Sequence, residues 1–241
     1  ISLIEPETGM IQSTADTSTL RVSCVAINSS ADIAVTGGYG GVIRVWKLRN
    51  FQKIHSFQGH QTGISSVAIS ANAAMAVSGG EDHSVRVWDL SLSSQRFLLR
   101  GHSSIVLTVA CSADGSRIVS ADLEGVVRLW EGPKYRKHRI LMGRSDGRTR
   151  IAMSANGALV AGFGTDGVIR VWNLQANTGA HIIRKCDVAL LCVAVSADGK
   201  RVACAGIDGV IYVMDAESGR ELFQLCGHGD AVTDLALSHD G

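Results

Sequence analysis

The amino-acid sequence predicts an all-β fold in which one structural unit recurs every 42 residues along a chain of 241 residues. All four tryptophans share this spacing: Trp46, Trp88, Trp130 and Trp172. A Gly-His pair keeps the same register in three copies: 59–60, 101–102 and 227–228. A turn sequence of the type Ser-Ala-Asn/Asp-Gly also returns with this period, from Ser70 to Gly241. A repeat of about 40–45 residues, with Gly-His early and a tryptophan late, indicates a four-stranded blade of a β-propeller.

Each whole unit contains the pattern expected for four strands, which we call a to d in chain order. In the copy that contains Trp88, the alternating run 64–69 predicts strand a. The turn sequence follows, and its Asn, Asp and Gly residues tolerate the left-handed backbone of tight hairpins. Residues 74–78 and 85–89 then predict strands b and c, and residues 97–99 predict strand d. β-Branched Val and Ile recur in strand c of every copy, which supports the assignment.

The repeat register divides residues 1–241, a single incomplete domain, into five whole blades and part of a blade at each end. The whole blades are expected at 19–57, 62–99, 104–142, 146–184 and 188–226. Residues 1–11 align with the end of a blade, and residues 230–241 align with the start of another, with strand a at 231–237. Because an open ring exposes the apolar faces of its end blades, we expect flanking sequence to complete a closed ring, with seven blades favoured over six.

The Gly-His and Trp-Asp pairs are most complete in residues 59–89, and through them the sequence resembles the WD-repeat (tryptophan–aspartate repeat) β-propeller family over nearly its whole length. The resemblance implies a buried tetrad of hydrogen-bonding side chains that links the inner loops of a blade to its tryptophan indole. In the second blade the matching residues are His60, Ser78, Asp82 and Trp88. In the third blade they are His102, Ser120, Glu124 and Trp130, with Glu124 in the position of the aspartate.

A Ser, a His and an Asp in one unit could also indicate acyl-transfer chemistry. The constellation recurs in the next blade, however, and a catalytic site is not expected once per blade. A satisfied polar network of this kind specifies a core instead, and losing one member costs on the order of 1–3 kcal/mol. We therefore expect no catalytic residue and no enzymatic activity.

Three blades depart from the tetrad pattern. The first blade has these residues at the four positions: Ser18, Thr36, Gly40 and Trp46. In the fourth blade, Arg144 could pair with Asp166 and replace the neutral network by an ion pair. The fifth blade has Cys186, Cys204, Asp208 and Met214. This set could be a soft-metal site, but nothing supplies the remaining ligands, so we expect reduced thiols, no metal and no cofactor.

The overall composition limits the classes of function. Apolar residues make up 46% of the chain and charged residues 19%, so a large core is expected and disorder is not. A formal net charge of +1 argues against attraction of the whole surface to a membrane or to nucleic acid, and no apolar run approaches the roughly 18 residues of a membrane span. The six cysteines show no CxxC spacing, which is typical of free thiols in a reducing compartment, so we expect an intracellular, cytoplasmic location.

One stretch departs from this charge balance, because residues 131–150 contain seven Lys and Arg side chains against Glu131 and Asp146. Four of the seven lie in the loop between strands c and d and at the start of strand d: Lys134, Arg136, Lys137 and Arg139. This basic loop is a candidate contact for an acidic partner, and the stretch 134–150 supports an alternative function as an RNA- or phosphate-binding module. Strand d should divide the stretch and aromatic residues are sparse, so a base-stacking groove is not indicated.

The repeat register also predicts which side chains reach the face formed by the d–a and b–c loops. One set directly precedes the aspartate position of the tetrad: Tyr39, Glu81, Leu123, Thr165 and Ile207. A second set lies at the start of strand a: Ile105, Leu107 and Leu191. Exposed aliphatic side chains on a rigid rim indicate a partner-binding patch, unless neighbouring loops cover them. We therefore expect a protein–protein interaction scaffold, one propeller of a larger protein or assembly, with proteins or peptides docking around the channel on this face.

Overall fold

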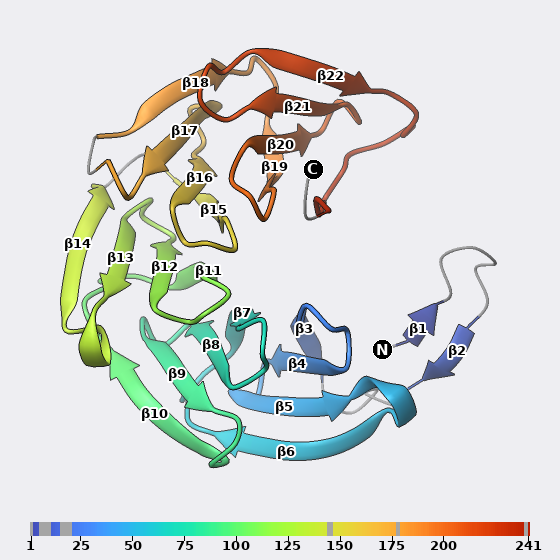
Figure 1. The fold of residues 1–241 in the computed structure, drawn as a ribbon, viewed down its shortest axis with the longest axis vertical. Helices are drawn as coiled ribbons and strands as arrows, with labels where there is room; N and C mark the ends of the chain where they lie inside the picture. The colour runs from blue at the N-terminus through green and yellow to red at the C-terminus, as the bar shows by residue number, and fades with distance from the viewer. Residues whose placement is uncertain (1, 5–10, 15–20, 144–146, 177–178, 239–240) are drawn as a thin grey trace.

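Figure 1 shows the fold in a computed structural model, which describes residues 2–4, 11–14, 21–143, 147–176, 179–238 and 241. Five four-stranded antiparallel sheets follow one another along the chain and are arranged about a common centre as blades of a propeller. In each blade the strands pair in chain order, with the first strand nearest the centre and the fourth at the outer edge. The all-β prediction is confirmed, whereas the total of seven blades remains a prediction. The described part of the chain contains no helix long and apolar enough to cross a membrane.

In the first three blades, the strands follow in chain order from the centre outwards. Blade one consists of β3 (Val22–Ile27), β4 (Ile33–Gly38), β5 (Val42–Lys47) and β6 (Gln52–Gln58). Blade two consists of β7 (Ile64–Ile69), β8 (Met75–Gly80), β9 (Val85–Asp89) and β10 (Ser94–Leu99). Blade three consists of β11 (Val106–Cys111), β12 (Arg117–Asp122), β13 (Val127–Glu131) and β14 (Lys137–Met142). Short 3-10 turns, η1 (Leu48–Asn50) and η2 (Pro133–Tyr135), lie between the third and fourth strands of blades one and three.

The last two blades repeat this order. Blade four consists of β15 (Arg150–Met153), β16 (Leu159–Phe163), β17 (Val168–Asn173) and β18 (His181–Lys185). Blade five consists of β19 (Leu190–Val195), β20 (Arg201–Gly206), β21 (Ile211–Asp215) and β22 (Glu221–Leu225). Each strand begins and ends within a few residues of the strand that the repeat predicts, because the β-branched runs and the turn sequences determine both boundaries.

The hydrophobic core lies between neighbouring blades. Trp88 of blade two is 1% exposed and packs in one cluster with Val35 and Ile43 of blade one. Phe57 of blade one stacks on the same indole, with ring centroids 5.6 Å apart. Trp130 and Trp172 pack in the same way against the blades that precede them. Trp88, Trp130 and Trp172 therefore each join their own blade to the preceding one, whereas Trp46 packs with Ala34 and Leu48 of its own blade.

Strand a carries a β-bulge near its start in four of the five blades. The residues at the four irregularities are Ser23, Ser65, Leu107 and Leu191. A bulge leaves one residue outside the hydrogen-bonded ladder and re-aims its side chain. Leu107 and Leu191, two of the predicted docking residues, therefore occupy equivalent bulge positions on the inner strands of blades three and five.

The two end segments differ from the sequence-based boundaries. β1 (Ser2–Ile4) and β2 (Ile11–Thr14) form a separate two-stranded antiparallel sheet, which extends past the boundary expected at residue 11. The strand predicted at 231–237 is not formed. This segment still packs on blade five, because Val232 is buried beside Cys192 and its N–H donates to the Gly206 carbonyl at 3.0 Å. A strand needs a ladder of neighbours, and no strand in the described part of the chain pairs with it.

Candidate functional site

In blade two, the four side chains named from the sequence form one buried chain of hydrogen bonds. The Trp88 indole Nε1 donates to Ser78 Oγ at 2.8 Å, and His60 Nε2 lies 2.7 Å from the same hydroxyl. His60 Nδ1 lies 2.8 Å from Asp82 Oδ1. Because the Asp82 carboxylate can only accept, the Nδ1 proton of His60 goes to Asp82, and Nε2 of the neutral imidazole then accepts the proton of the Ser78 hydroxyl. These hydrogen bonds link the loop before β7 to β8, to β9 and to the turn between those two strands.

This geometry is unsuited to nucleophilic catalysis. A catalytic serine must meet a substrate carbonyl while its histidine takes the proton. Ser78 is fully buried and His60 is 1% exposed, so no substrate atom can approach the hydroxyl. The indole bond from Trp88 also occupies the serine oxygen. The four side chains therefore share only their residue types with a catalytic triad. Their hydrogen bonds connect the strands of the blade.

The buried histidine makes the stability of the fold depend on pH. Burial lowers the pKa of His60, against the opposing effect of Asp82. As pH falls below the unfolded value of about 6.5, the unfolded chain takes up a proton first, and the native state loses up to about 1.4 kcal/mol per pH unit until its own pKa is reached. We expect the free energy of unfolding in urea to fall between pH 7.5 and 5.5, and His60→Gln to show a shallower slope. Equal slopes for the two proteins would contradict this assignment.

Blade three builds the same network with a different carboxylate. His102 Nδ1 lies 2.7 Å from Asp122 Oδ2, and His102 Nε2 lies 2.7 Å from Ser120 Oγ. The Trp130 indole donates to Ser120 Oγ at 2.8 Å. Glu124 occupies the register position of the aspartate, but its expected role in the tetrad is wrong, because Asp122, two residues earlier, contacts the histidine.

The surroundings of the two carboxylates explain the correction. Asp122 ends β12, is fully buried, and also accepts hydrogen bonds from the backbone N–H groups of Val126 and Glu124 at 2.9 and 3.1 Å. The Glu124 side chain accepts a hydrogen bond from Ser103 Oγ at 3.1 Å in an exposed environment. A buried imidazole N–H needs an acceptor at short range, and the shorter aspartate at the strand end supplies it.

Gly80 of blade two stands at the position equivalent to Asp122. A Cβ added there would collide with the His60 ring and would lie 3.0 Å from Asp82 Oδ1. In blade two, Asp82 already fills the space beside the histidine, so this position requires glycine. Blades two and three thus supply one carboxylate each, from positions two residues apart in the same turn.

The other blades replace parts of the network. In blade one the Trp46 indole donates to Thr36 Oγ1 at 2.9 Å. In blade four, which has Gly162 at the serine position, the Trp172 indole donates to the Leu141 carbonyl at 3.2 Å. Asp166 forms an ion pair with Arg170 at 2.5 Å. The expected partner of Asp166, Arg144, lies outside the described residues, as does Ser18 of blade one.

Blade five replaces the network with sulfur. Cys186, Cys204 and Met214 lie in one buried cluster, and all six cysteines of the chain are free thiols. The hydrogen bond from the Cys204 thiol, together with the Arg184 guanidinium, outweighs burial and holds the pKa of Cys186 well below its usual range. The same hydrogen bond, and burial, raise the pKa of Cys204. In the described part of the chain, no three His, Cys, Asp or Glu side chains gather closely enough to hold a metal ion.

The predicted docking residues differ in how far they reach the solvent. Tyr39 is 63% exposed and Ile207 is 57% exposed. Glu81 and Thr165 are also exposed, but the Glu81 carboxylate folds back and accepts a hydrogen bond from the Gly63 N–H at 3.3 Å. The remaining four are half-buried: Ile105, Leu107, Leu123 and Leu191.

One backbone hydrogen bond recurs on this face and holds the b–c loops in place. The N–H of the residue before the aspartate position donates to the carbonyl of a residue close to the start of strand a. The four bonds are Tyr39 to Arg21 at 3.3 Å, Glu81 to Gly63 at 2.9 Å, Leu123 to Ile105 at 2.8 Å and Ile207 to Ala189 at 3.1 Å. The exposed side chains of Tyr39 and Ile207 therefore project from a backbone that is fixed to the inner strand.

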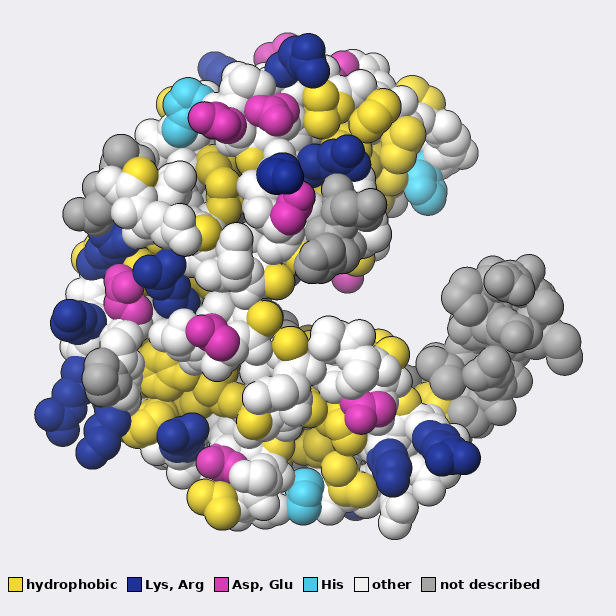
Figure 2. Space-filling model, viewed as in Figure 1, with side chains coloured by type: hydrophobic (Ala, Val, Ile, Leu, Met, Phe, Trp, Pro, Cys, Tyr) yellow, Lys and Arg dark blue, Asp and Glu magenta, His cyan; other side chains and the backbone are white. Residues whose placement is uncertain are grey.

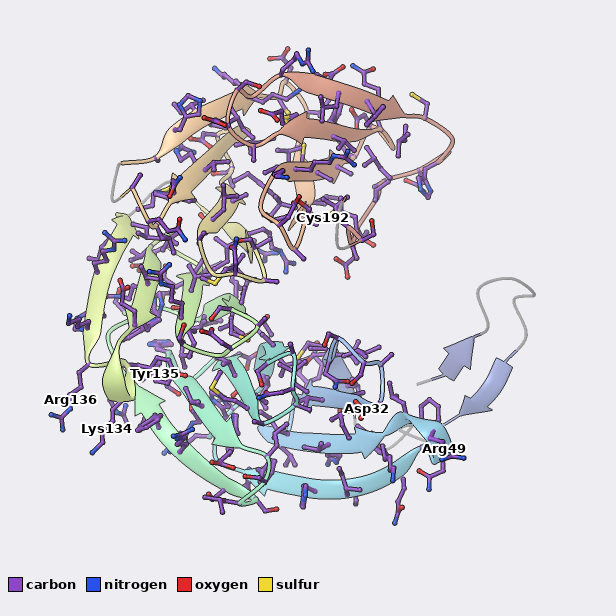
Figure 3. All side chains as sticks on the ribbon, in the orientation of Figure 1. Asp32, Arg49, Lys134, Tyr135, Arg136 and Cys192 are labelled. Atoms are coloured by element: carbon purple, nitrogen blue, oxygen red, sulfur yellow. The ribbon has the colours of Figure 1, made fainter. Side chains whose placement is uncertain are left out.

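The structure separates the two ends of the basic stretch. Lys134 and Arg136 point outwards from the outer edge of the arc, where Figure 2 shows a group of Lys and Arg side chains (Figure 3). Lys137 is exposed, and Arg139 Nε lies 3.7 Å from Glu131 at the same edge. Arg150, in contrast, begins β15, which lies near the centre (Figure 1). The described basic residues of the stretch 134–150 therefore lie in two separate places.

The innermost strands enclose a cavity of about 450 Å³ at the centre of the arc. Small hydroxyl side chains form much of its wall: Ser23, Ser65, Ser66, Thr108 and Thr233. Arg150 and Leu191 also line it, from blades four and five. This cavity corresponds to the channel that the sequence predicts beside the docking face.

A family model described as "WD domain, G-beta repeat" matches the chain five times, at residues 11–47, 51–89, 93–131, 136–173 and 178–215. The matches together cover most of the 241 residues. From the second onwards, each match begins at or close to the fourth strand of one blade and ends with the third strand of the next. In the second to fourth matches, this unit is the one joined by the tryptophan packing. No curated protein matches the chain.

Proposed function

Because the chain belongs to the WD-repeat family, we propose that it is a non-catalytic platform on which other proteins or peptides dock through the face formed by the d–a and b–c loops. The observation that carries the proposal is the exposure of Tyr39 and Ile207 at the tips of loops that backbone hydrogen bonds hold rigid. Large apolar side chains on a fixed rim pay little conformational entropy on binding, and they form the anchors of many interfaces.

Two further observations support this proposal. The hydroxyl and imidazole groups that resemble a catalytic triad are buried, and their hydrogen-bonding capacity is used within the blades. The six free thiols fit a reducing compartment, and we place the function in the cytoplasm on that ground. On this proposal the chain is one propeller of a larger protein or complex.

The proposal is tested with a pair of matched substitutions. Ile207→Asp alters the docking face, and Ile182→Asp places the same charge on β18 at the outer edge, where Ile182 is 59% exposed. In crosslinking of intact cells followed by mass spectrometry, we expect the Ile207 variant to recover its partners at least tenfold less, with Tm unchanged and the Ile182 variant unaffected. Equal recovery by both variants would refute docking on this face, and a large fall in Tm would show that Ile207 belongs to the core.

The alternative function, RNA or phosphate binding through residues 134–150, has less support. The described basic residues of the stretch are split between the outer edge and the centre. The basic loop contains one Phe, Tyr or Trp residue, Tyr135, whose hydroxyl donates to the Gly115 carbonyl. Base-stacking surfaces need exposed aromatic rings along a continuous basic groove. Tight binding of single-stranded RNA that weakens steeply with salt would favour this alternative.

A further inference from the structure

A small pocket between blades four and five combines two arginines with an apolar wall. The cavity has a volume of about 230 Å³. Blade four contributes Arg148, Arg150 and Phe163, and blade five contributes Ala189, Leu190 and Leu191. Arg150 and Leu191 also line the central cavity, so the pocket lies beside the channel.

The two arginines of this pocket have no carboxylate partner within the described ranges. Other arginines of blades four and five do pair: Arg170 with Asp166, and Arg184 with Glu221. The b–c turn of blade five is also occupied, because Asp208 accepts a hydrogen bond from the Tyr212 hydroxyl at 2.9 Å. Arg148 and Arg150 form no ion pair with any described residue, and both are exposed. The pocket therefore presents two guanidinium groups that no described carboxylate neutralises, and guanidinium N–H groups are hydrogen-bond donors.

The apolar part of the pocket continues onto the docking face. Phe163 is 4% exposed and Leu190 is 8% exposed, so they form a fixed floor. Leu191 is the half-buried residue of the β19 bulge. Ile207 is 57% exposed and donates its N–H to the carbonyl of Ala189, a residue of the pocket. An exposed aliphatic side chain thus lies next to the charged pocket on the same rim.

We propose that this pocket binds an aspartate or glutamate side chain of a partner peptide, with an aliphatic residue of the same peptide packing against Ile207. This inference rests on the proposed docking function and names the ligand class that the face selects. Guanidinium groups bind carboxylates by paired, charge-assisted hydrogen bonds, and a pocket next to apolar surface strengthens them because less water competes. The volume of about 230 Å³ lies below the roughly 300–1,000 Å³ of most small-molecule sites, which suits one side chain of a longer segment.

A nucleic-acid ligand fits the pocket less well. Its aromatic ring, Phe163, is buried in the floor and has no free face for a base. The remaining basic side chains of the stretch, Lys134 and Arg136, project at the outer edge of the arc (Figure 3) and cannot extend a phosphate track from Arg150 near the centre.

The test is a selection of random heptapeptides displayed on phage against the full chain. We expect the selected peptides to be enriched in Asp or Glu next to Leu, Ile or Val. The double variant Arg148→Gln/Arg150→Gln should lose the acidic enrichment, whereas Arg136→Gln at the outer edge should keep it. For one selected peptide, fluorescence anisotropy should show at least tenfold weaker binding to the double variant than to the wild type. Changing the acidic residue of the peptide to its amide should weaken binding to the wild type by a similar factor.

Each other outcome decides against the inference. Selected peptides without acidic enrichment, or the same enrichment on the double variant, would overturn it. A single-stranded RNA probe that competes with the peptide and loses affinity in the double variant would identify a nucleic-acid site instead. If Ile207→Asp abolishes partner recovery while the arginine substitutions change nothing, the docking function stands and the carboxylate pocket fails. If neither change has an effect, both proposals fail.

Discussion

Replacing Asp122 by alanine is expected to lower the free energy of unfolding by about 3–5 kcal/mol. The Asp122 carboxylate is fully buried and accepts hydrogen bonds from His102 and from the backbone N–H groups of Glu124 and Val126. Alanine would leave three donors without this acceptor, two of them in buried hydrogen bonds, and would empty the space of the carboxylate. Buried polar groups that lose their partners account for many of the largest single-substitution effects in proteins.

Glu124→Ala is the matched control, because Glu124 occupies the same turn and is the carboxylate that the repeat register selects. We expect Glu124→Ala to cost less than about 1 kcal/mol, since its bond to Ser103 lies in exposed surroundings. Urea denaturation of both variants measures the difference. A larger loss for Glu124→Ala than for Asp122→Ala would show that the longer side chain holds His102 in solution.

This pair of residues shows where a sequence repeat stops being predictive. The 42-residue period identifies equivalent backbone positions, and it correctly predicts the strands of the five whole blades. A hydrogen bond depends on where a side-chain atom ends, and two positions in one turn can reach the same imidazole nitrogen. The sequence does contain a signal, because blade three has Asp122 after Ser120-Ala121 where blade two has Gly80 after Ser78-Gly79.

The sequence repeat also does not predict which loop side chains are exposed or whether a segment finds a strand to pair with. The register places Leu123 and Ile207 on equivalent loops, yet Leu123 is half-buried and Ile207 is 57% exposed. Coverage of a loop residue depends on the neighbouring blade, which differs from copy to copy. The alternation in residues 231–237 predicts a strand, but strand formation depends on a partner ladder that no described segment provides. The Arg148–Arg150 pocket likewise forms only when blade five packs beside blade four.

In each of blades two and three, only one of two turn positions can place a carboxylate beside the histidine. In blade three the strand-end position carries Asp122, and the later position carries Glu124, which turns away from His102 towards Ser103. In blade two the later position carries Asp82, whose Oδ1 accepts from His60, from Ser84 Oγ at 2.6 Å and from the Ser84 N–H at 3.2 Å. The space beside each histidine holds one carboxylate, so a side chain at the second position must be absent or directed elsewhere.

Gly80→Ala is therefore expected to destabilise the fold by about 3 kcal/mol through overpacking. The added methyl group would collide with the His60 ring, which is buried and tied by hydrogen bonds at both nitrogens, so the ring cannot move aside without breaking one of them. Gly40→Ala is the control, because Gly40 occupies the position of Asp82 in blade one and an added Cβ there meets no atom within 4 Å. Urea denaturation should show a large loss for Gly80→Ala and a change within about 0.5 kcal/mol for Gly40→Ala. Equal stability of the two variants would mean that the His60 network has room for a side chain at Gly80, and the one-carboxylate constraint would then be wrong.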